Sequence, residues 1–214
     1  MNILLTGFEP FGGETINPAW EVARALHNQL IGGATVHARC LPTSFGEAPE
    51  VLAQALAALH PGVVIALGQA SGRCEISIER LAINLIDARI ADNAGQRPQD
   101  MPVHADAPAA YFTTLPIKAM RDALRAAGHP AGLSLSAGAF VCNQVFFHLQ
   151  HQLAGRGVRS GFIHLPALPE QAARAQASVP SMGLAEQIDA IRLALVIALA
   201  GEDSGRPDEG SPTS

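Results

Sequence analysis

Three short motifs of the chain each carry one side chain that nucleophilic catalysis could use. Glu79 lies in Ser-Ile-Glu-Arg, Cys142 in Gly-Ala-Phe-Val-Cys-Asn, and His164 in Phe-Ile-His-Leu-Pro. A thiol can act as the nucleophile, an imidazole can take its proton, and a carboxylate can orient the imidazole. Because the three residues are far apart in the sequence, only the folded geometry can bring them together.

Cys142 has the most favourable setting of the three cysteines. It follows a glycine turn, at the start of a helix that we predict over 142–153. The free N–H groups and partial positive charge of a helix N-terminus lower a thiol pKa, and the same N–H groups could hold an oxyanion. Cys40 is predicted to lie within a strand and Cys74 in a polar turn. The alternative for Cys142 is a buried core thiol, the usual fate of a free cysteine.

His164 is one of eight histidines, so only its position can distinguish it as a candidate. It ends an apolar strand predicted over 161–165, and strand ends in open α/β sheets line the ligand crevice. His148 and His151 are rival bases on the predicted Cys142 helix, but the nearer one lies about 9 Å up the helix axis from Cys142. We therefore expect the rivals to be packing or surface groups, and a core or strand-end role remains the alternative for His164.

Glu79 is a carboxylate flanked by apolar side chains, and a carboxylate in such a setting has to be paired. One interpretation is a salt bridge to Arg80 or another arginine. The functional interpretation is that Glu79 accepts a hydrogen bond from the second nitrogen of His164 and so sets its tautomer.

The segment Gly-Phe-Glu-Pro-Phe-Gly-Gly follows the first predicted strand. It lacks the lysine and the spacing of a phosphate-binding loop, so it is a weak nucleotide signature. Its aromatic residues, Phe8 and Phe11, would suit a small, flat, apolar ligand, or they cap the core. No cysteine–histidine grouping has metal-ligand spacing, so we expect neither a metal nor a cofactor.

Strand and helix patterns alternate along the chain. Val63–Leu67 is a continuous apolar run, typical of a strand buried on both faces of a parallel sheet. The pattern predicts an α/β fold, a three-layer sandwich with a mainly parallel central sheet and a mixed edge, of the phosphorylase/hydrolase-like type. The predicted strands cover 2–8, 35–41, 63–67, 133–136 and 161–165, and the predicted helices begin at Pro18 and cover 46–60, 117–127, 142–153 and 181–200.

Two segments between these elements are less regular. Residues 76–90 alternate more than they follow a helical period, which suggests extended structure such as a hairpin. Residues 91–110 are polar and rich in proline, and a loop of this length is often functional.

Composition bounds the class of protein. With 214 residues, 48% apolar and 15% charged, we expect one domain over 1–200, followed by a disordered tail at 201–214 that has no apolar residue. The net charge of −5 argues against nucleic-acid binding. The N-terminus lacks the pattern of a signal peptide, and the apolar segment 184–200 carries charges that argue against a membrane span. Three cysteines make a poor disulfide framework, so we expect a cytoplasmic protein.

The chain resembles the pyrrolidone carboxyl peptidases, also called pyroglutamyl peptidase I, which are cysteine peptidases that remove an N-terminal pyroglutamate. The resemblance runs from Met1 to about Ala200. Several independent motifs in the same order carry it: Leu-Thr-Gly-Phe-Glu-Pro-Phe-Gly-Gly, Asn-Pro at 17–18, Ile-Ser-Ile-Glu-Arg, Asp-Ala-Arg-Ile at 87–90, Ala-Gly-x-x-Val-Cys-Asn, Phe-Ile-His-x-Pro and Leu-Pro-Glu-Gln at 168–171.

The resemblance implies a role for each matching residue. Cys142 would be the nucleophile, His164 the general base and then acid, and Glu79 the orienting carboxylate. Phe8 and Phe11 match the aromatic pocket around the pyrrolidone ring, and Gln69 and Arg89 match positions near the substrate carbonyl and the oxyanion; Arg89 could equally pair with Asp87 or Glu79.

The resemblance also implies small peptides with an N-terminal pyroglutamate as substrates, and a homo-oligomer such as a tetramer. The interval between Cys142 and His164 is shorter than the family leads us to expect, which is consistent with a trimmed loop at 154–159, and the tail from Gly201 is an extension.

Two other functions fit the same layer architecture. One is a phosphorylase-like, nucleoside-binding enzyme, because fold alone does not fix function. The other is an inactive module that binds pyroglutamyl peptides without cleaving them.

Overall fold

Seven strands form the central sheet of the computed structural model, which describes residues 1–175 and 178–201. Their order across the sheet is β2-β3-β1-β4-β9-β5-β8, and a separate two-stranded sheet joins β6 to β7. The strands are β1 (Asn2–Phe8), β2 (Leu30–Ile31), β3 (Ala34–Leu41), β4 (Val63–Gln69), β5 (Ile76–Glu79), β6 (Leu81–Ile83), β7 (Ala110–Phe112), β8 (Ala131–Ser134) and β9 (Arg159–Leu165).

The central sheet is mainly parallel. β3, β1, β4 and β9 run in the same direction, whereas β5 is antiparallel to β9 and parallel to β8. At the opposite edge, the short β2 is antiparallel to β3. The predicted three-layer α/β fold with a mixed edge is therefore confirmed.

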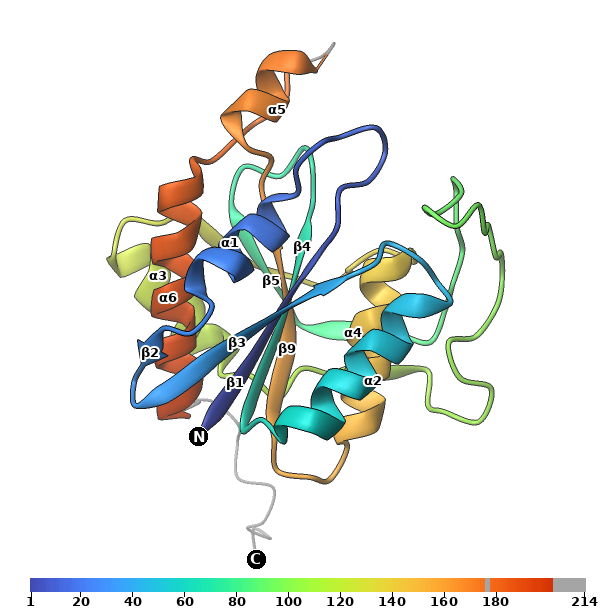
Figure 1. Cartoon of the computed structure of the whole chain (residues 1–214), viewed down its shortest axis with the longest axis horizontal. Coiled ribbons are helices and arrows are strands. Elements are labelled where there is room, and N and C mark those ends of the chain that lie inside the picture. Colours follow the sequence, from blue (N-terminus) through green and yellow to red (C-terminus); the bar gives the residue numbers. More distant parts are fainter. Residues whose placement is uncertain (176–177, 202–214) are drawn as a thin grey trace, which may run out of the picture.

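Helices cover both faces of the sheet (Figure 1). On one side, α1, α3 and α6 pack over the sheet in one apolar cluster, and on the other, α2 and α4 form a second cluster that contains Phe146, Phe147 and Phe162. The helices are α1 (Pro18–Leu26), α2 (Glu47–Leu59), α3 (Ile117–Ala126), α4 (Val141–Leu153), α5 (Pro169–Arg174) and α6 (Leu184–Ala200). Strands between two such layers are buried on both faces, which is why β4 is a continuous apolar run.

Local signals mark several helix ends. Asn17 caps α1 by accepting a hydrogen bond from Ala19 N at 3.0 Å, and Pro18 occupies the first turn, as predicted. Gly201 ends α6 in the left-handed conformation, with a φ of 77°.

The extended structure predicted within 76–90 is confirmed for β5 and β6, but the two strands do not form a hairpin. β5 enters the central sheet between β9 and β8, while β6 leaves that sheet and pairs with β7. Both partners of β5 come from later in the chain, so the local alternation of residues 76–90 could not reveal them.

Other boundaries shift by a few residues. The strand predicted at 133–136 is β8 at 131–134, because Ser136 N donates to Ser134 Oγ and turns the chain out of the sheet. α6 begins three residues later than expected, at Leu184, and α5 was not predicted at all. Of the predicted tail 201–214, every residue after Gly201 lies outside the described residues.

No helix among the described residues combines the length and the apolar character that crossing a bilayer requires.

Candidate active site

The three motifs meet at the carboxyl ends of β4 and β9. His164 is the penultimate residue of β9 and lies opposite Gly68 of β4 on one side and Ser77 of β5 on the other. Glu79 ends β5, two residues beyond Ser77, so its side chain lies on the same face as that of Ser77 and diagonal to His164. Cys142 is the second residue of α4. Residues from three distant segments thus meet at one edge of the sheet.

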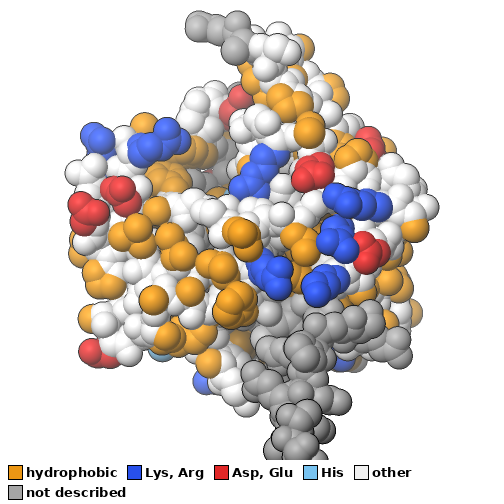
Figure 2. Space-filling model, turned by 180° about the vertical axis from the view of Figure 1, so that it is seen from behind, with side chains coloured by type: hydrophobic (Ala, Val, Ile, Leu, Met, Phe, Trp, Pro, Cys, Tyr) orange, Lys and Arg blue, Asp and Glu red, His pale blue; other side chains and the backbone are white. Residues whose placement is uncertain are grey.

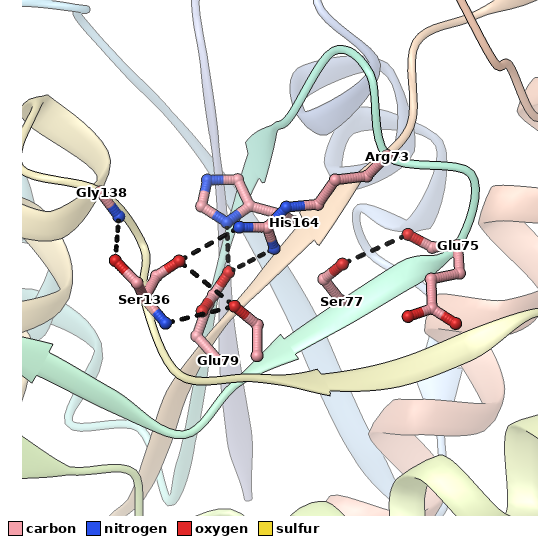
Figure 3. Close-up of polar contacts among 8 residues, drawn as sticks. Arg73, Glu75, Ser77, Glu79, Ser136, Gly138 and His164 are labelled. Carbon is pink, nitrogen blue, oxygen red and sulfur yellow. Dashed lines mark hydrogen bonds and ion pairs between the residues drawn. The ribbon is translucent and has the colours of Figure 1, made fainter.

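His164 and Glu79 form a buried hydrogen-bonded pair (Figure 3). His164 Nδ1 lies 2.7 Å from Glu79 Oε1, and the two residues are 4% and 0% exposed. An ionised carboxylate only accepts hydrogen bonds, so Nδ1 carries the proton and Nε2 keeps its lone pair. The pair therefore presents a neutral imidazole as a base.

Arg73 is a second partner of Glu79. Its Nη1 donates to Glu79 Oε1 at 2.7 Å and its Nη2 donates to the carbonyl oxygen of Ser136 at 3.1 Å. The sequence predicts Arg80 or another arginine as the partner; Arg80 is exposed, and Arg73, in the turn after β4, makes the contact. No local pattern at Arg73 predicts this role.

Burial and charge act in opposite directions on this pair. Burial raises the pKa of Glu79, but the hydrogen bond from His164 and the charge that His164 carries once protonated, with contributions from Ser134 and Arg73, outweigh it and leave the pKa below its ordinary value. Burial lowers the pKa of His164, and the hydrogen bond and charge of Glu79 oppose this only in part. The result is an ionised carboxylate beside a neutral imidazole.

Cys142 lies where its thiol faces the same strand ends. A Cβ atom built on Gly68 would come within 3.1 Å of Cys142 Sγ, so the sulfur rests on the glycine that lies opposite His164. Any larger residue at 68 would push against the thiol. No hydrogen bond joins Sγ to the imidazole in the described part of the chain, although both side chains line one pocket.

The expected lowering of the Cys142 pKa is contradicted. Burial, reinforced by the negative charge of Glu79, raises the pKa of the thiol to about 12, and neither a backbone hydrogen bond nor the positive charge of Arg73 offsets this. The sequence indicates the helix N-terminus and the carboxylate, but not that the thiol is buried next to the charge of that carboxylate. With its pKa raised in this way, the thiol keeps its proton near neutral pH.

The pocket above Cys142 and His164 has a volume of about 570 Å³. All four predicted substrate-binding residues line it: Phe8, Phe11, Gln69 and Arg89. Glu79 does not line it, because it lies buried behind His164.

The aromatic side of the pocket contains one ring that sequence reasoning missed. Phe140 immediately precedes α4, and its ring centroid lies 5.4 Å from that of Phe11 and 5.0 Å from that of Phe45. Phe8 is 3% exposed and packs against Phe162, with 6.4 Å between the ring centroids, so it belongs both to the core and to the pocket wall. The position of Phe140 two residues before Cys142 was the available signal.

A chain of amide groups orients Gln69. Gln171, in α5, accepts a hydrogen bond from Leu168 N at 3.0 Å and donates to Gln69 Oε1 at 3.2 Å. Because Leu168 N can only donate, Gln171 must present its Nε2 to Gln69. Gln69 Nε2 then donates to Ser71 Oγ at 2.9 Å, beside the pocket.

Arg89 is exposed at the pocket and forms no ion pair within the described residues. The suggested pairing with Asp87 or Glu79 is therefore absent from this structure. Its guanidinium stays available to an acceptor in the pocket.

The rival residues lie away from the pocket. His148 and His151 contact His104 near the other end of α4. Cys40 lies in β3, where burial and the charge of Glu9 raise its pKa to about 11, and Cys74 is exposed. Among the described residues, no cluster of three or more histidine, cysteine, aspartate or glutamate side chains is placed to hold a metal ion.

The whole described chain has close relatives. Residues 1–201 match the family model described as Pyroglutamyl peptidase. The sequence is 54% identical over 211 residues to the pyrrolidone-carboxylate peptidase of Cupriavidus pinatubonensis, covering 97% of each chain. It is 55% identical over 205 residues to that of Chromobacterium violaceum, covering 95% of this chain and 96% of the relative.

Solved structures agree with the sequence relatives. A mutant pyrrolidone carboxyl peptidase from Pyrococcus furiosus aligns with a TM-score of 0.91 and 44% identity, covering 94% of this chain and 99% of that one. Pyroglutamyl peptidase I from Bacillus amyloliquefaciens aligns with a TM-score of 0.89 and 42% identity, covering 93% and 97%. The chain therefore belongs to the pyroglutamyl peptidase family, whose members are cysteine-type hydrolases.

Proposed function

We propose that this protein hydrolyses the bond that follows an N-terminal pyroglutamate and releases free pyroglutamate. Family membership supports the reaction, and one observation carries its assignment to residues: a buried, hydrogen-bonded His164–Glu79 pair lies at the pocket that the Cys142 thiol lines. In this proposal Cys142 is the nucleophile, His164 the general base and acid, and Glu79 the orienting carboxylate.

The thiol reacts as it loses its proton. Since the pKa of Cys142 is raised to about 12, a standing thiolate is not the resting state. His164 Nε2 takes the proton as Sγ forms its bond to the substrate carbonyl carbon, whose π electrons move to oxygen. The oxyanion then collapses, the carbon–nitrogen bond breaks, and His164 returns the proton to the leaving amine. Water, activated by His164, releases pyroglutamate from the acyl-enzyme.

The start of α4 offers donors for the oxyanion. Gln144 N donates to Phe140 O, so the helical ladder begins there, and the N–H groups of Val141, Cys142 and Asn143 precede it. Phe140 provides no side-chain cap. These N–H groups lie at the positive end of the helix dipole, beside the thiol that attacks.

The pocket favours an uncharged N-terminal ring. Phe11 and Phe140 offer flat apolar surfaces to a lactam, whereas an ordinary ammonium would lose its water against them. Two carboxylates also line the pocket: Glu14 pairs with Arg174, and Asp87 is exposed. Gln69 presents its amide donor to a substrate carbonyl, and Arg89 supplies a cation for the carbonyl or the oxyanion.

A chromogenic pyroglutamyl amide tests the proposal. We expect turnover by the native enzyme, loss of turnover after thiol alkylation, and loss of nearly all activity in Cys142→Ser with an unchanged circular dichroism spectrum. Cys40→Ser and Cys74→Ser are matched controls that stay active. Full activity in Cys142→Ser would overturn the nucleophile, and a native protein that binds pyroglutamyl peptides without cleaving them would be an inactive module.

We further propose that the protein is a single-domain cytoplasmic enzyme that forms a homo-oligomer such as a tetramer and acts on small pyroglutamyl peptides. Its three free cysteines suit a reducing compartment. Met101 and Phe112, which are 51% and 63% exposed, supply apolar surface that subunit contacts could bury, and Figure 2 shows hydrophobic side chains across the rear face. Light scattering after size-exclusion chromatography measures the subunit number, and a monomer at micromolar concentration would contradict the oligomer.

A further inference from the structure

The two oxygens of the Glu79 carboxylate are used unequally. Oε1 accepts from both His164 and Arg73, each at 2.7 Å, whereas Oε2 is buried and has no hydrogen-bond partner among the described residues. Burying a charged carboxylate is costly unless a cation accompanies it. Glu79 is 0% exposed, so its charge has to be balanced within the protein.

His164 does not balance that charge in the resting enzyme. Its imidazole is neutral there, because burial holds its pKa below the ordinary value. Among the described residues, Arg73 is the remaining cation in contact with Glu79. Of the other charged groups nearby, Glu75 turns its carboxylate away from Arg73 in Figure 3, and Arg89 has no ion pair to the cluster.

We propose that Arg73 is the resting counterion of Glu79 and a positioning residue for the catalytic pair. This inference rests on the proposed function of Cys142, His164 and Glu79.

A permanent cation keeps the net charge of the site at zero through the first step. Before the step the four groups are a neutral thiol, a neutral imidazole, a carboxylate and a guanidinium, with a net charge of zero. Transfer of the proton from Cys142 Sγ to His164 Nε2 makes a thiolate and an imidazolium, and the net charge is again zero. Without Arg73 the same groups would carry a net charge of −1 in both states, which favours protonation of Glu79. A protonated Glu79 could donate to Nδ1 and would then stabilise the wrong tautomer.

Arg73 also ties two segments of the site together. Its second contact, to the Ser136 carbonyl oxygen, holds the loop that leads through Gly138 to Cys142. Gly138 lies in the left-handed region with a φ of 79°, and its N–H donates to Ser136 Oγ at 3.1 Å. The planar guanidinium reaches Glu79 and Ser136 with different nitrogens, which a lysine ammonium does less well.

Two substitutions separate charge from geometry. Arg73→Lys keeps the cation and weakens the tie to Ser136, whereas Arg73→Met removes both. Arg80→Met is the matched control, because Arg80 is a neighbouring but exposed arginine that has no ion pair among the described residues. Each variant is first checked for a native circular dichroism spectrum and a cooperative thermal transition.

The readout is the pH profile of kcat/KM for a pyroglutamyl amide. For Arg73→Met we expect a loss of about a hundredfold and an acid limb that moves to higher pH. The positive charge of Arg73 lowers the pKa of His164, so its removal raises that pKa, and the neutral base then exists only at higher pH. Arg73→Lys should lose less activity and keep the acid limb of the native enzyme, and Arg80→Met should match the native enzyme in both.

A double-mutant cycle tests whether Arg73 acts through Glu79. In a Glu79→Gln background, Arg73→Met should cost at most a few-fold, because its partner charge is already gone. An unshifted acid limb in Arg73→Met, or an equal loss in both backgrounds, would overturn the inference and leave Arg73 as a structural contact. Activity in Cys142→Ser, measured in the same series, would instead overturn the proposed function itself.

Discussion

Two polar clusters that contain histidine lie close to α4, and they differ in charge and in access to the pocket. Near the start of the helix, His164 contacts Glu79, which in turn contacts Arg73. Farther along, His148 and His151 of α4 contact His104 from the long loop that follows β6. Tyr111 of β7 completes this second cluster, its hydroxyl 2.8 Å from His151 Nδ1.

The clusters differ in their partners. His164 has an ionised carboxylate on Nδ1, which leaves Nε2 as a base that faces a pocket. In the second cluster, His104 Nε2 lies 2.9 Å from His148 Nδ1, and Gln152 Nε2 lies 2.7 Å from His148 Nε2, so both nitrogens of His148 are occupied. One ring nitrogen can donate to another only while the accepting ring is neutral. A histidine without a carboxylate or a free nitrogen serves as a structural link.

The second cluster has a structural use. It joins the loop that contains His104 to α4, and the earlier part of the same loop carries Arg89 at the pocket. Both clusters make aromatic contacts, but His164 is buried whereas His151 is exposed. Of the two clusters, the one around His164 combines a carboxylate partner with access to the pocket, which are the features that acid–base chemistry requires.

The largest effect should come from exchanging single histidines for alanine. We expect His164→Ala to lower kcat/KM for a pyroglutamyl amide by at least about a thousandfold, because no base remains beside Cys142. His148→Ala should remain within roughly threefold of the native value. Steady-state kinetics at one pH is sufficient. If His148→Ala lowered kcat/KM as much as His164→Ala, the two clusters would not differ in their role in catalysis.

Glu79→Gln removes the charge that distinguishes the first cluster while keeping its shape. We expect kcat to fall by about a thousandfold, because the amide can donate to Nδ1 and stabilise the wrong tautomer of His164. KM should change much less, since Glu79 does not line the pocket. A native kcat in a folded Glu79→Gln variant would mean that the carboxylate has only a structural role.

The second cluster should appear in the pH dependence of stability. Burial, with the positive charges that His104 and His151 can carry, lowers the pKa of His148 from 6.5 to about 4. The unfolded chain therefore binds this proton more readily than the folded one, so the stabilisation is present above pH 6.5 and is lost as the pH falls towards about 4. We expect His148→Phe to reduce the drop in Tm between pH 7 and pH 5, relative to the native protein. If Tm dropped equally in both proteins, His148 would not be a source of the pH dependence of stability.

Tyr111→Phe should have the smallest effect. It removes one solvent-accessible hydrogen bond to His151, so we expect a loss of about 0.5 kcal/mol or less in the free energy of unfolding, measured with urea. Activity should be unchanged. A large loss of activity would mean that the second cluster controls the pocket through the loop that carries Arg89.

Much of the fold could be predicted from the sequence, because the signals for its helices and strands are local. Asn17 and Pro18 are a cap and a first-turn residue wherever the helix packs, and the apolar run of β4 requires burial on both faces. The position of β5, next to the edge strand β8, was harder to predict. β5 takes its place from contacts with β9 and β8, and pairing with strands so distant in sequence leaves no trace in the local pattern.

The family and the α/β class could be read from the amino-acid sequence, and so could Glu79, Cys142 and His164 as site candidates, because motifs and periodicity are properties of the chain. Packing was needed to show that Arg73 rather than Arg80 faces Glu79, that Phe140 joins the pocket, and that burial raises the pKa of Cys142 instead of lowering it. These outcomes depend on which groups are excluded from water together. Desolvation and charge pairing act through space, so they exist only once distant segments have packed against one another.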